Sequence, residues 1–284
     1  MPLPPVVAIR RRSTDTPLGR RHEHLLAGRP QRRPPPIPWD AFDPARYPEP
    51  ALALAAQAQR ALAPGEYSAV DLFARIASCL SLNGAPLDLV TAATRIPTDE
   101  ARHAEYALRM AALCAGHEVS FELARASVNA RWKTLVEIEE LDVVMLEIAA
   151  VSETLAGRLL GACLDGAEDV TARALFTSIL GDEVHHARLG WYYLAWRSPQ
   201  WTRPERQRMA DAAGELVMNA ELLFQRGRDA PAGSRRAARA LGVLGSVAQQ
   251  QAVHRAMEDE IVPALDALGL GASHAWRARR PRTA

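Results

Sequence analysis

Two copies of one short pattern contain the side chains with the clearest chemistry in this chain. The segments Asp99-Glu100-Ala101-Arg102-His103 and Asp182-Glu183-Val184-His185-His186 each place a Glu three residues before a His. Residues three apart on an α-helix lie on the same face, so each copy offers a carboxylate oxygen and an imidazole nitrogen to one metal ion. Because roughly half a Glu-x-x-His match is expected by chance in a chain of this composition, the pair suggests two metal ions only if its context agrees.

The helices around the first copy place another carboxylate at the same depth. The segment Asn83-Gly84-Ala85-Pro86 is a strong turn signal between two stretches of helical character. Glu66 lies 18 residues before Gly84, and His103 lies 18 residues after Ala85. Antiparallel helices rise equally, by about 1.5 Å per residue, so Glu66 should lie opposite the first copy.

A second hairpin repeats this arrangement. Its turn is expected around residues 165–169, with Glu153 lying 14 residues before Ala167. Glu183 and His186 follow 16 and 19 residues after Ala167, within about one turn of the same level. One Glu, a turn and a Glu-x-x-His therefore occur twice, which makes chance a poor explanation.

These candidate ligands interrupt helix faces that are otherwise apolar. Glu183 and His186, for example, share a stripe with Phe176, Ile179 and Tyr193. Burying four carboxylates without compensation would cost many kcal/mol, whereas two divalent cations would supply four positive charges. Mixed carboxylate and imidazole ligation suits iron or manganese, so two irons are the first expectation and a manganese–iron pair is the alternative.

The rest of the chain predicts an all-α protein. Ala and Leu dominate beyond Pro50, and β-branched runs are rare. We expect helices near residues 51–63, 65–82, 87–114, 134–164, 170–196, 203–228 and 235–268, the last broken at Pro263. Residues 1–49 are rich in Pro and Arg and are expected to form an extended arm, which Trp39, Phe42 and Tyr47 could dock on the body. The helical domain would span 50–270, and a basic tail would span 271–284.

Composition argues against several other classes. The chain has 284 residues, 48% of them hydrophobic, and a net charge of +1, with its excess of arginine near the two ends. We expect these arginine-rich ends to be solvated and to bind neither nucleic acid nor a membrane. The cysteines Cys79, Cys114 and Cys163 have no C-x-x-C spacing, which argues against disulfides, a rubredoxin-type iron site and structural zinc, and favours a cytoplasmic protein.

On these residues the chain resembles the ferritin-like diiron-carboxylate superfamily, whose ligands are one Glu from each of two helices and a Glu-x-x-His from each of two others. The resemblance covers roughly residues 60–196 and implies a four-helix bundle with additional helices. The implied ligands, which would also be the catalytic residues, are Glu66, Glu100, His103, Glu153, Glu183 and His186. Asp99 and Asp182 resemble the acids that orient the imidazoles in this superfamily.

Two further segments are similar to the ligand helices of bacterial ferritin-like oxygenases, namely Glu66-Tyr67-Ser68-Ala69-Val70 and Ser152-Glu153-Thr154-Leu155-Ala156. Many aminoarene N-oxygenases of the superfamily have an additional His ligand four residues before the last ligand Glu. Ile179 occupies that position here.

Several residues have simpler interpretations. A Glu at position 66, just after Pro64-Gly65, is also what a helix N-terminus favours, and Asp71 would then be the substitute ligand. His185 faces roughly 100° away from the ligand stripe and is expected either to support the ligands from behind or to lie at the surface. Glu147 is more readily a solvated residue than a ligand. For the aromatic residues near the ligands, packing is the favoured role; they are Tyr106, Trp191, Tyr192 and Tyr193.

Three functions compete. The first is an oxygenase that activates O2 and oxidises a small organic substrate, with amine N-oxygenation in natural-product tailoring as the leading reaction and aliphatic C–H hydroxylation, desaturation or C–C cleavage as alternatives. The second is a ferritin- or rubrerythrin-type iron-handling or peroxide-scavenging protein, and the third is a metal-free bundle. Additional helices that wall off a pocket favour the oxygenase. Phe73, Ile96, Phe176 and Ile179 are expected to line that pocket. Electrons would come from a separate reductase, a ferredoxin or the substrate, and a homodimer is left open.

Overall fold

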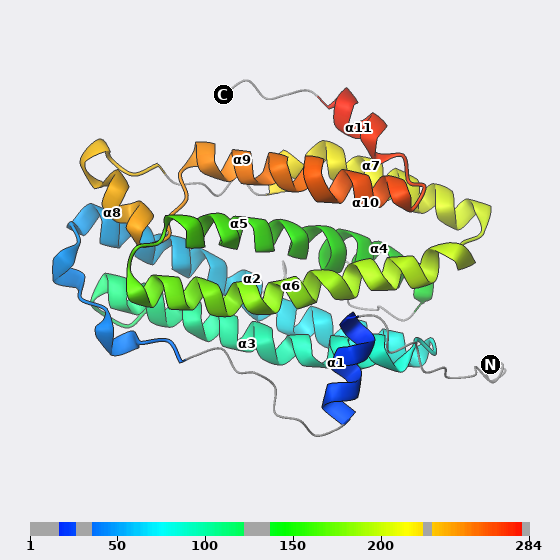
Figure 1. Cartoon of the computed structure of the whole chain (residues 1–284), viewed down its shortest axis with the longest axis horizontal. Helices are drawn as coiled ribbons and strands as arrows, with labels where there is room; N and C mark the ends of the chain where they lie inside the picture. Colours follow the sequence, from blue (N-terminus) through cyan, green and yellow to red (C-terminus); the bar gives the residue numbers. More distant parts are fainter. Residues whose placement is uncertain (1–16, 27–35, 122–136, 224–228, 280–284) are drawn as a thin grey trace.

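The computed structural model describes residues 17–26, 36–121, 137–223 and 229–279 (Figure 1). Its longest helices are α2 (Glu49–Leu82), α3 (Leu87–Ala115), α6 (Val170–Arg197) and α7 (Arg203–Leu223). Another long helical run joins α4 (Ile138–Val144), the π-helix η4 (Met145–Ser152) and α5 (Glu153–Gly166). No strand occurs in the described ranges, so these confirm the all-α prediction.

Two antiparallel hairpins lie side by side, with α3 packed against α6 (Figure 1). The α2–α3 hairpin turns at Gly84, whose φ of 65° is left-handed and costs a glycine little. The α5–α6 hairpin turns just before Asp169, whose carboxylate accepts hydrogen bonds from the backbone N–H groups of Thr171 and Ala172 at 2.9 Å and so caps α6. Both turns lie where the sequence predicts them.

Most of the remaining helices cover the α4–α5 side of these hairpins (Figure 1). They are α7, α8 (Arg235–Ala240), α9 (Ser246–Ala256), the π-helix η7 (Met257–Ile261), α10 (Val262–Ala267) and α11 (Ala272–Ala278). Helix α9 packs along α5, and these two helices form walls of a groove that is described below.

Two predicted helix boundaries were wrong. The helices expected at 51–63 and 65–82 form one helix, α2, with Pro64 inside it. A proline removes one backbone hydrogen bond, and the packing of α2 along the whole of α3 outweighs that loss. The expected helix at 235–268 is interrupted at 241–245, where Gly242 has a φ of 80°, and not at Pro263, which lies in the first turn of α10.

Both predicted ends contain a helix that the sequence analysis did not anticipate. Helix α1 (Pro17–Leu26) lies within the expected extended arm and packs on α3 through the buried Leu18. Helix α11 lies within the expected tail and buries Trp276. In each case an apolar side chain packs against the helical domain, and its burial offsets the entropic cost of ordering a short segment.

The aromatic residues of the arm dock as expected. The Trp39 ring lies 5.7 Å from that of Tyr106, Phe42 is buried, and the Tyr47 hydroxyl donates a hydrogen bond of 2.8 Å to Asp169. The beginning of the helix expected at 134–164, the end of the one expected at 203–228, and most of the terminal arginines fall outside the described residues. Within those residues, no helix combines the length and the apolar character needed to cross a membrane.

Candidate metal centre

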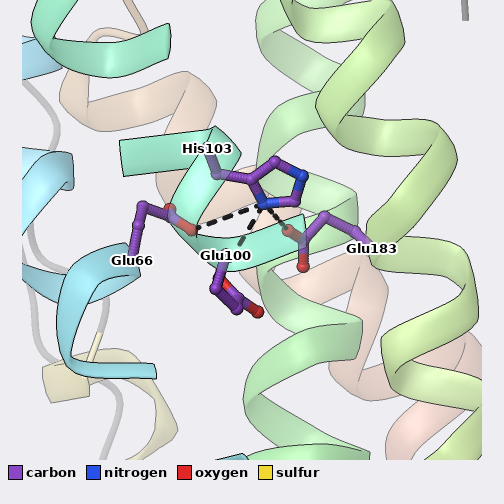
Figure 2. A group of neighbouring side chains, drawn as sticks. All are labelled: Glu66, Glu100, His103 and Glu183. Atoms are coloured by element: carbon purple, nitrogen blue, oxygen red, sulfur yellow. Dashed lines mark ion pairs between the residues drawn. The ribbon is translucent and has the colours of Figure 1, made fainter. Parts of the chain in front are cut away.

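The six candidate ligands converge at the middle of the two hairpins. Glu66 comes from α2, Glu100 and His103 from α3, Glu153 from the first residue of α5, and Glu183 and His186 from α6. Figure 2 shows the carboxylates of Glu66, Glu100 and Glu183 around the His103 ring. The equal-depth arguments for both hairpins therefore hold: the structure brings all six residues together.

The ligand atoms form two overlapping groups, within each of which they all lie within 4.8 Å of one another. One group contains Glu66, Glu100, His103 and Glu183, and the other contains Glu100, Glu153, Glu183 and His186. Glu100 and Glu183 belong to both. Two metal ions held in this way would share two bridging carboxylates, and each would have one Glu and one His of its own.

The imidazole nitrogens sit among these carboxylates. His103 Nδ1 lies 3.2 Å from Glu183, 3.6 Å from Glu66 and 3.8 Å from Glu100. His186 Nδ1 lies 3.1 Å from Glu100, 3.7 Å from Glu153 and 3.8 Å from Glu183. Both Nδ1 atoms are buried and have no hydrogen-bond partner in the described structure. A buried polar atom without a partner is costly, and a metal ion at each group would satisfy both nitrogens.

The acids on the other side of the rings are arranged crosswise. The Asp182 carboxylate, from α6, lies 3.2 Å from Nε2 of His103 on α3, and that of Asp99, from α3, lies 3.5 Å from Nε2 of His186 on α6. The Arg102 guanidinium lies 2.7 Å from both carboxylates. Each aspartate thus faces the histidine of the opposite helix, and one arginine joins the two. Carboxylates placed there fix the tautomer and orientation of a ligand histidine, leaving Nδ1 for the metal.

Burial and neighbouring charge set the protonation of this site. Burial raises the pKa of Glu100 to about 8, and burial together with the nearby charge of Glu153 raises the pKa of Glu183 well above its usual value. Burial alone would lower the pKa of His103 and His186, but the surrounding carboxylates outweigh it and raise both well above 6.5. The metal-free centre therefore holds protons that a metal ion would have to displace.

Outside the centre, Asp99 remains ionised. Burial acts to raise its pKa, but the neighbouring His186 and Arg102 lower it to about 2. The ionised Asp99 carboxylate lies 3.5 Å from Nε2 of His186, which is an ion-pair distance and not a hydrogen bond.

The local backbone next to the ligands is irregular. The π-helix η4 ends at the residue before Glu153, and single π turns inside α-helices often occur at functional sites. Helix α6 reaches this π-helix through Gly190, one turn after His186. A Cβ at position 190 would overlap the backbone nitrogen of Ala150 and the carbonyl carbon of Ala149, so only a glycine permits this approach.

One edge of the centre opens to a groove. The groove lies between α5, α6 and α9, has a volume of about 810 Å³, and includes Glu153 and Glu183 in its lining. This corrects the predicted pocket, because none of the four expected lining residues lines the groove. Phe73 packs against the His186 ring at 6.1 Å, and Ile96 lines a separate small cavity beside Asp99. The other two, Phe176 and Ile179, lie in the apolar core.

Other candidates lie away from the ligand groups. Asp71 is exposed and forms an ion pair with Arg75 at 3.0 Å, so it is not a substitute for Glu66. His185 belongs to neither ligand group, and burial lowers its pKa to about 4. Glu147 also belongs to neither group. The Tyr193 hydroxyl donates a hydrogen bond to buried Asp142 at 2.7 Å, which is a packing role.

Sequence reasoning missed three features of the site: the link made by Arg102, the π-helix, and the close approach at Gly190. Arg102 stands inside the first copy of the pattern, and its place between Glu100 and His103 was a signal that could have been used. Comparisons with models of protein families, with curated proteins and with solved structures find no match to this chain. The described residues therefore show an all-helical structure with Glu/His groups that could hold metal ions.

Proposed function

We propose that this protein is a non-haem diiron oxygenase of the ferritin-like superfamily, which activates O2 to oxidise a small organic substrate. The observation that carries the proposal is the opening of the Glu153 and Glu183 edge of a buried two-metal centre into a groove of about 810 Å³. Four carboxylates and two imidazoles suit two irons, which would supply the redox chemistry with O2 when bound.

The protein's residues have distinct roles in this proposal. Glu66, Glu100, His103 and Glu183 would hold one ion, and Glu100, Glu153, Glu183 and His186 would hold the other. Asp99 and Asp182 hold the imidazoles, and Arg102 holds both aspartates. The groove would deliver the substrate to the Glu153 and Glu183 side of the centre.

Amine N-oxygenation is the leading reaction. Besides the two ligand carboxylates, the groove lining includes three acids (Asp165, Asp259 and Glu260) and three arginines (Arg158, Arg188 and Arg255). The lining therefore has no net positive charge that would repel a basic amine. C–H hydroxylation at the same position is the runner-up. A separate reductase or ferredoxin would supply electrons.

Metal analysis and oxygen reactivity test the proposal. Purified protein reconstituted with Fe²⁺ should hold about two irons per chain, one for each ligand group. The reduced protein, mixed with O2 in rapid-mixing spectroscopy, should develop a transient visible absorption. A panel of aromatic and aliphatic amines should yield oxygenated products detectable by mass spectrometry, and the Glu183→Ala variant should yield none.

Two outcomes would count against it. Protein that stays metal-free after reconstitution would contradict the metal centre itself. Iron uptake with oxygen-driven mineral growth, and without turnover of any organic substrate, would favour an iron-storage function instead.

A further inference from the structure

The groove that reaches the metal centre continues past it along α5. A second cavity, of about 430 Å³, shares Ala162, Asp165 and Arg255 with the groove and extends towards α8. The two cavities thus meet on the same stretch of α5. We call them together the α5–α9 channel, with an inner part at Glu153 and an outer part at α8.

The floor of the channel is built from glycine. Gly157 and Gly161 follow Glu153 at four and eight residues, on the same face of α5. A Cβ at Gly157 would only just touch Glu183 and Leu180, at 3.9 Å, and one at Gly161 would meet nothing within 4 Å. Since α5 rises about 1.5 Å per residue, the floor runs roughly 12 Å from Glu153 to Gly161 and roughly 18 Å to Asp165.

Charge differs between the two parts. In the inner part, apart from the two candidate ligands, Arg158 and Arg188 stand against Asp259 and Glu260, and Arg158 forms an ion pair with Glu260. These charges balance. Three arginines line the outer part: Arg235, Arg239 and Arg255. Two acids, Asp165 and Asp229, stand against these three arginines. The outer part is therefore net cationic.

Backbone hydrogen bonds fix the position of the helices that carry the outer arginines. The backbone N–H groups of Glu168 and Asp169 donate hydrogen bonds to the carbonyl of Ala240 at 2.9 and 3.1 Å, which ties the end of α8 to the α5–α6 turn. Asp229 accepts a hydrogen bond of 3.0 Å from the backbone N–H of Ser246 and caps the start of α9. This cap lowers the pKa of Asp229, so Asp229 stays ionised and the outer part keeps three arginines against two carboxylates.

From this geometry we infer that the α5–α9 channel binds an elongated substrate with an anionic end group. The reactive end lies at Glu153 and Glu183, and the anionic end, a carboxylate or a phosphate ester, lies at Arg235, Arg239 and Arg255, on the order of 12–18 Å away along α5. This inference rests on the proposed function for the identity of the reacting end. The anion site itself requires no metal.

Three probes of equal length test the anion site. They are 12-aminododecanoate, 12-aminododecyl phosphate and 12-aminododecan-1-ol, which differ only in the end opposite the amine. Calorimetric titrations would use the iron-loaded protein without O2 and, in parallel, the protein as purified. One or both anionic probes should bind at least tenfold more tightly than the alcohol, because hydrogen bonds to a charged group contribute about 1.5–3 kcal/mol. The tighter of the two identifies the end group.

A matched pair of variants locates the effect. Arg255→Gln should remove most of the preference for the anionic probe, whereas Arg236→Gln should leave it unchanged. Arg236 is a neighbouring arginine of α8 that does not line the channel and lies 3.9 Å from Glu168. Gly161→Leu should weaken all three probes by filling the floor. Both Arg255 and Arg236 are exposed, so neither change threatens folding.

The inference is overturned if the three probes bind alike, if none binds, or if the two arginine variants behave alike. Its failure is distinct from that of the proposed function. Protein that binds iron and oxidises amines but shows no anion preference contradicts only the inference, and protein that binds the anionic probes but no iron contradicts only the proposed function.

Discussion

The α2–α3 and α5–α6 hairpins carry the same ligand pattern but support it differently. In the first, a proline stands inside the helix shortly before each Glu: Pro64 precedes Glu66 by two residues, and Pro97 precedes Glu100 by three. In the second, the π-helix η4 ends just before Glu153. Both devices interrupt regular backbone hydrogen bonding next to a ligand. One arrangement of candidate ligands is thus supported by two kinds of helix distortion.

The surroundings of the two hairpins also differ. Glu153 and Glu183 of the α5–α6 hairpin line the groove, whereas no ligand of the α2–α3 hairpin does so. The latter hairpin contributes Arg102, which links both aspartates, whereas His185 stands at the matching position of the second copy. The α5–α6 hairpin thus provides access to the centre, and the α2–α3 hairpin provides the charge that fixes both imidazoles.

The largest effect is expected where α6 meets the π-helix. Gly190→Ala should lower the free energy of unfolding by about 3 kcal/mol or more, because the new Cβ overlaps the backbone of Ala149 and Ala150. Denaturant unfolding monitored by circular dichroism measures this. The control is Gly181→Ala on the same helix, where a Cβ would meet nothing within 4 Å. That change should stabilise by about 0.5–1 kcal/mol. Equal stabilities would show that α6 does not rest on η4 through Gly190.

The second-largest effect is expected on metal content, which distinguishes residues that belong to both ligand groups from residues that belong to only one. Glu183→Ala should abolish binding of both metals, since Glu183 belongs to both ligand groups, whereas Glu66→Ala should remove only one. Glu66 is also the more peripheral ligand, with its side chain 24% exposed compared with 3% for Glu183. Metal analysis after reconstitution measures the stoichiometry, and Glu105→Ala on the exposed face of α3 is the control. Loss of both metals from Glu66→Ala would contradict the division into two groups.

The same contrast explains how much the sequence could predict. Counting residues from each turn correctly predicted that the six candidate ligands come together, because depth in a helical hairpin depends only on the number of residues. Pro64 is visible in the sequence but was given too much weight, since its lost hydrogen bond is small against the packing of a helix of 34 residues. The π-helix and the channel depend on how α6 and α9 pack on α5. Such packing leaves no local signal beyond single glycines such as Gly190.

The crosswise arrangement of the aspartates predicts that a change of an aspartate on one hairpin weakens the metal held by the histidine of the other. Asp182→Asn should weaken the metal held by His103, on the other hairpin, and Asp99→Asn should weaken the metal held by His186. Changes at residues that support a ligand histidine cost about 10- to 100-fold in affinity. Mn²⁺ titrations followed by electron paramagnetic resonance measure this. In the Glu66→Ala background, where only the metal of His186 should remain, Asp99→Asn should weaken binding more than Asp182→Asn does.

His185→Ala provides the control for that prediction. His185 precedes the ligand His186 but belongs to neither ligand group, so its removal should leave both metal affinities unchanged. If His185→Ala weakens binding as much as Asp182→Asn does, the loss reflects general damage to α6 and the crosswise pairing would not account for it.

The smallest effect expected is a pH dependence of the metal-free protein. Glu100 has a pKa raised to about 8 by burial, and the carboxylates around His103 and His186 raise the pKa of both rings. A raised pKa in the folded state means that the folded protein binds more protons than the unfolded chain. Stability is therefore fully present at low pH and is lost as the pH rises through about 8, by roughly 1.4 kcal/mol per pH unit for each proton released.

Metal binding should cancel this dependence, since metal ions replace the same protons. The difference in Tm between metal-loaded and metal-free protein should therefore widen as the pH rises from about 4.5 to about 8, and Mn²⁺ binding should release protons into a weak buffer. Glu100→Gln should reduce both effects, because an amide cannot release the proton. Glu153→Gln should not remove a proton in this way, because the pKa of Glu153 is lowered: the nearby His186 outweighs its burial. A pH dependence that is abolished equally by both changes would place the proton on the shared centre as a whole and would contradict the difference in protonation between Glu100 and Glu153.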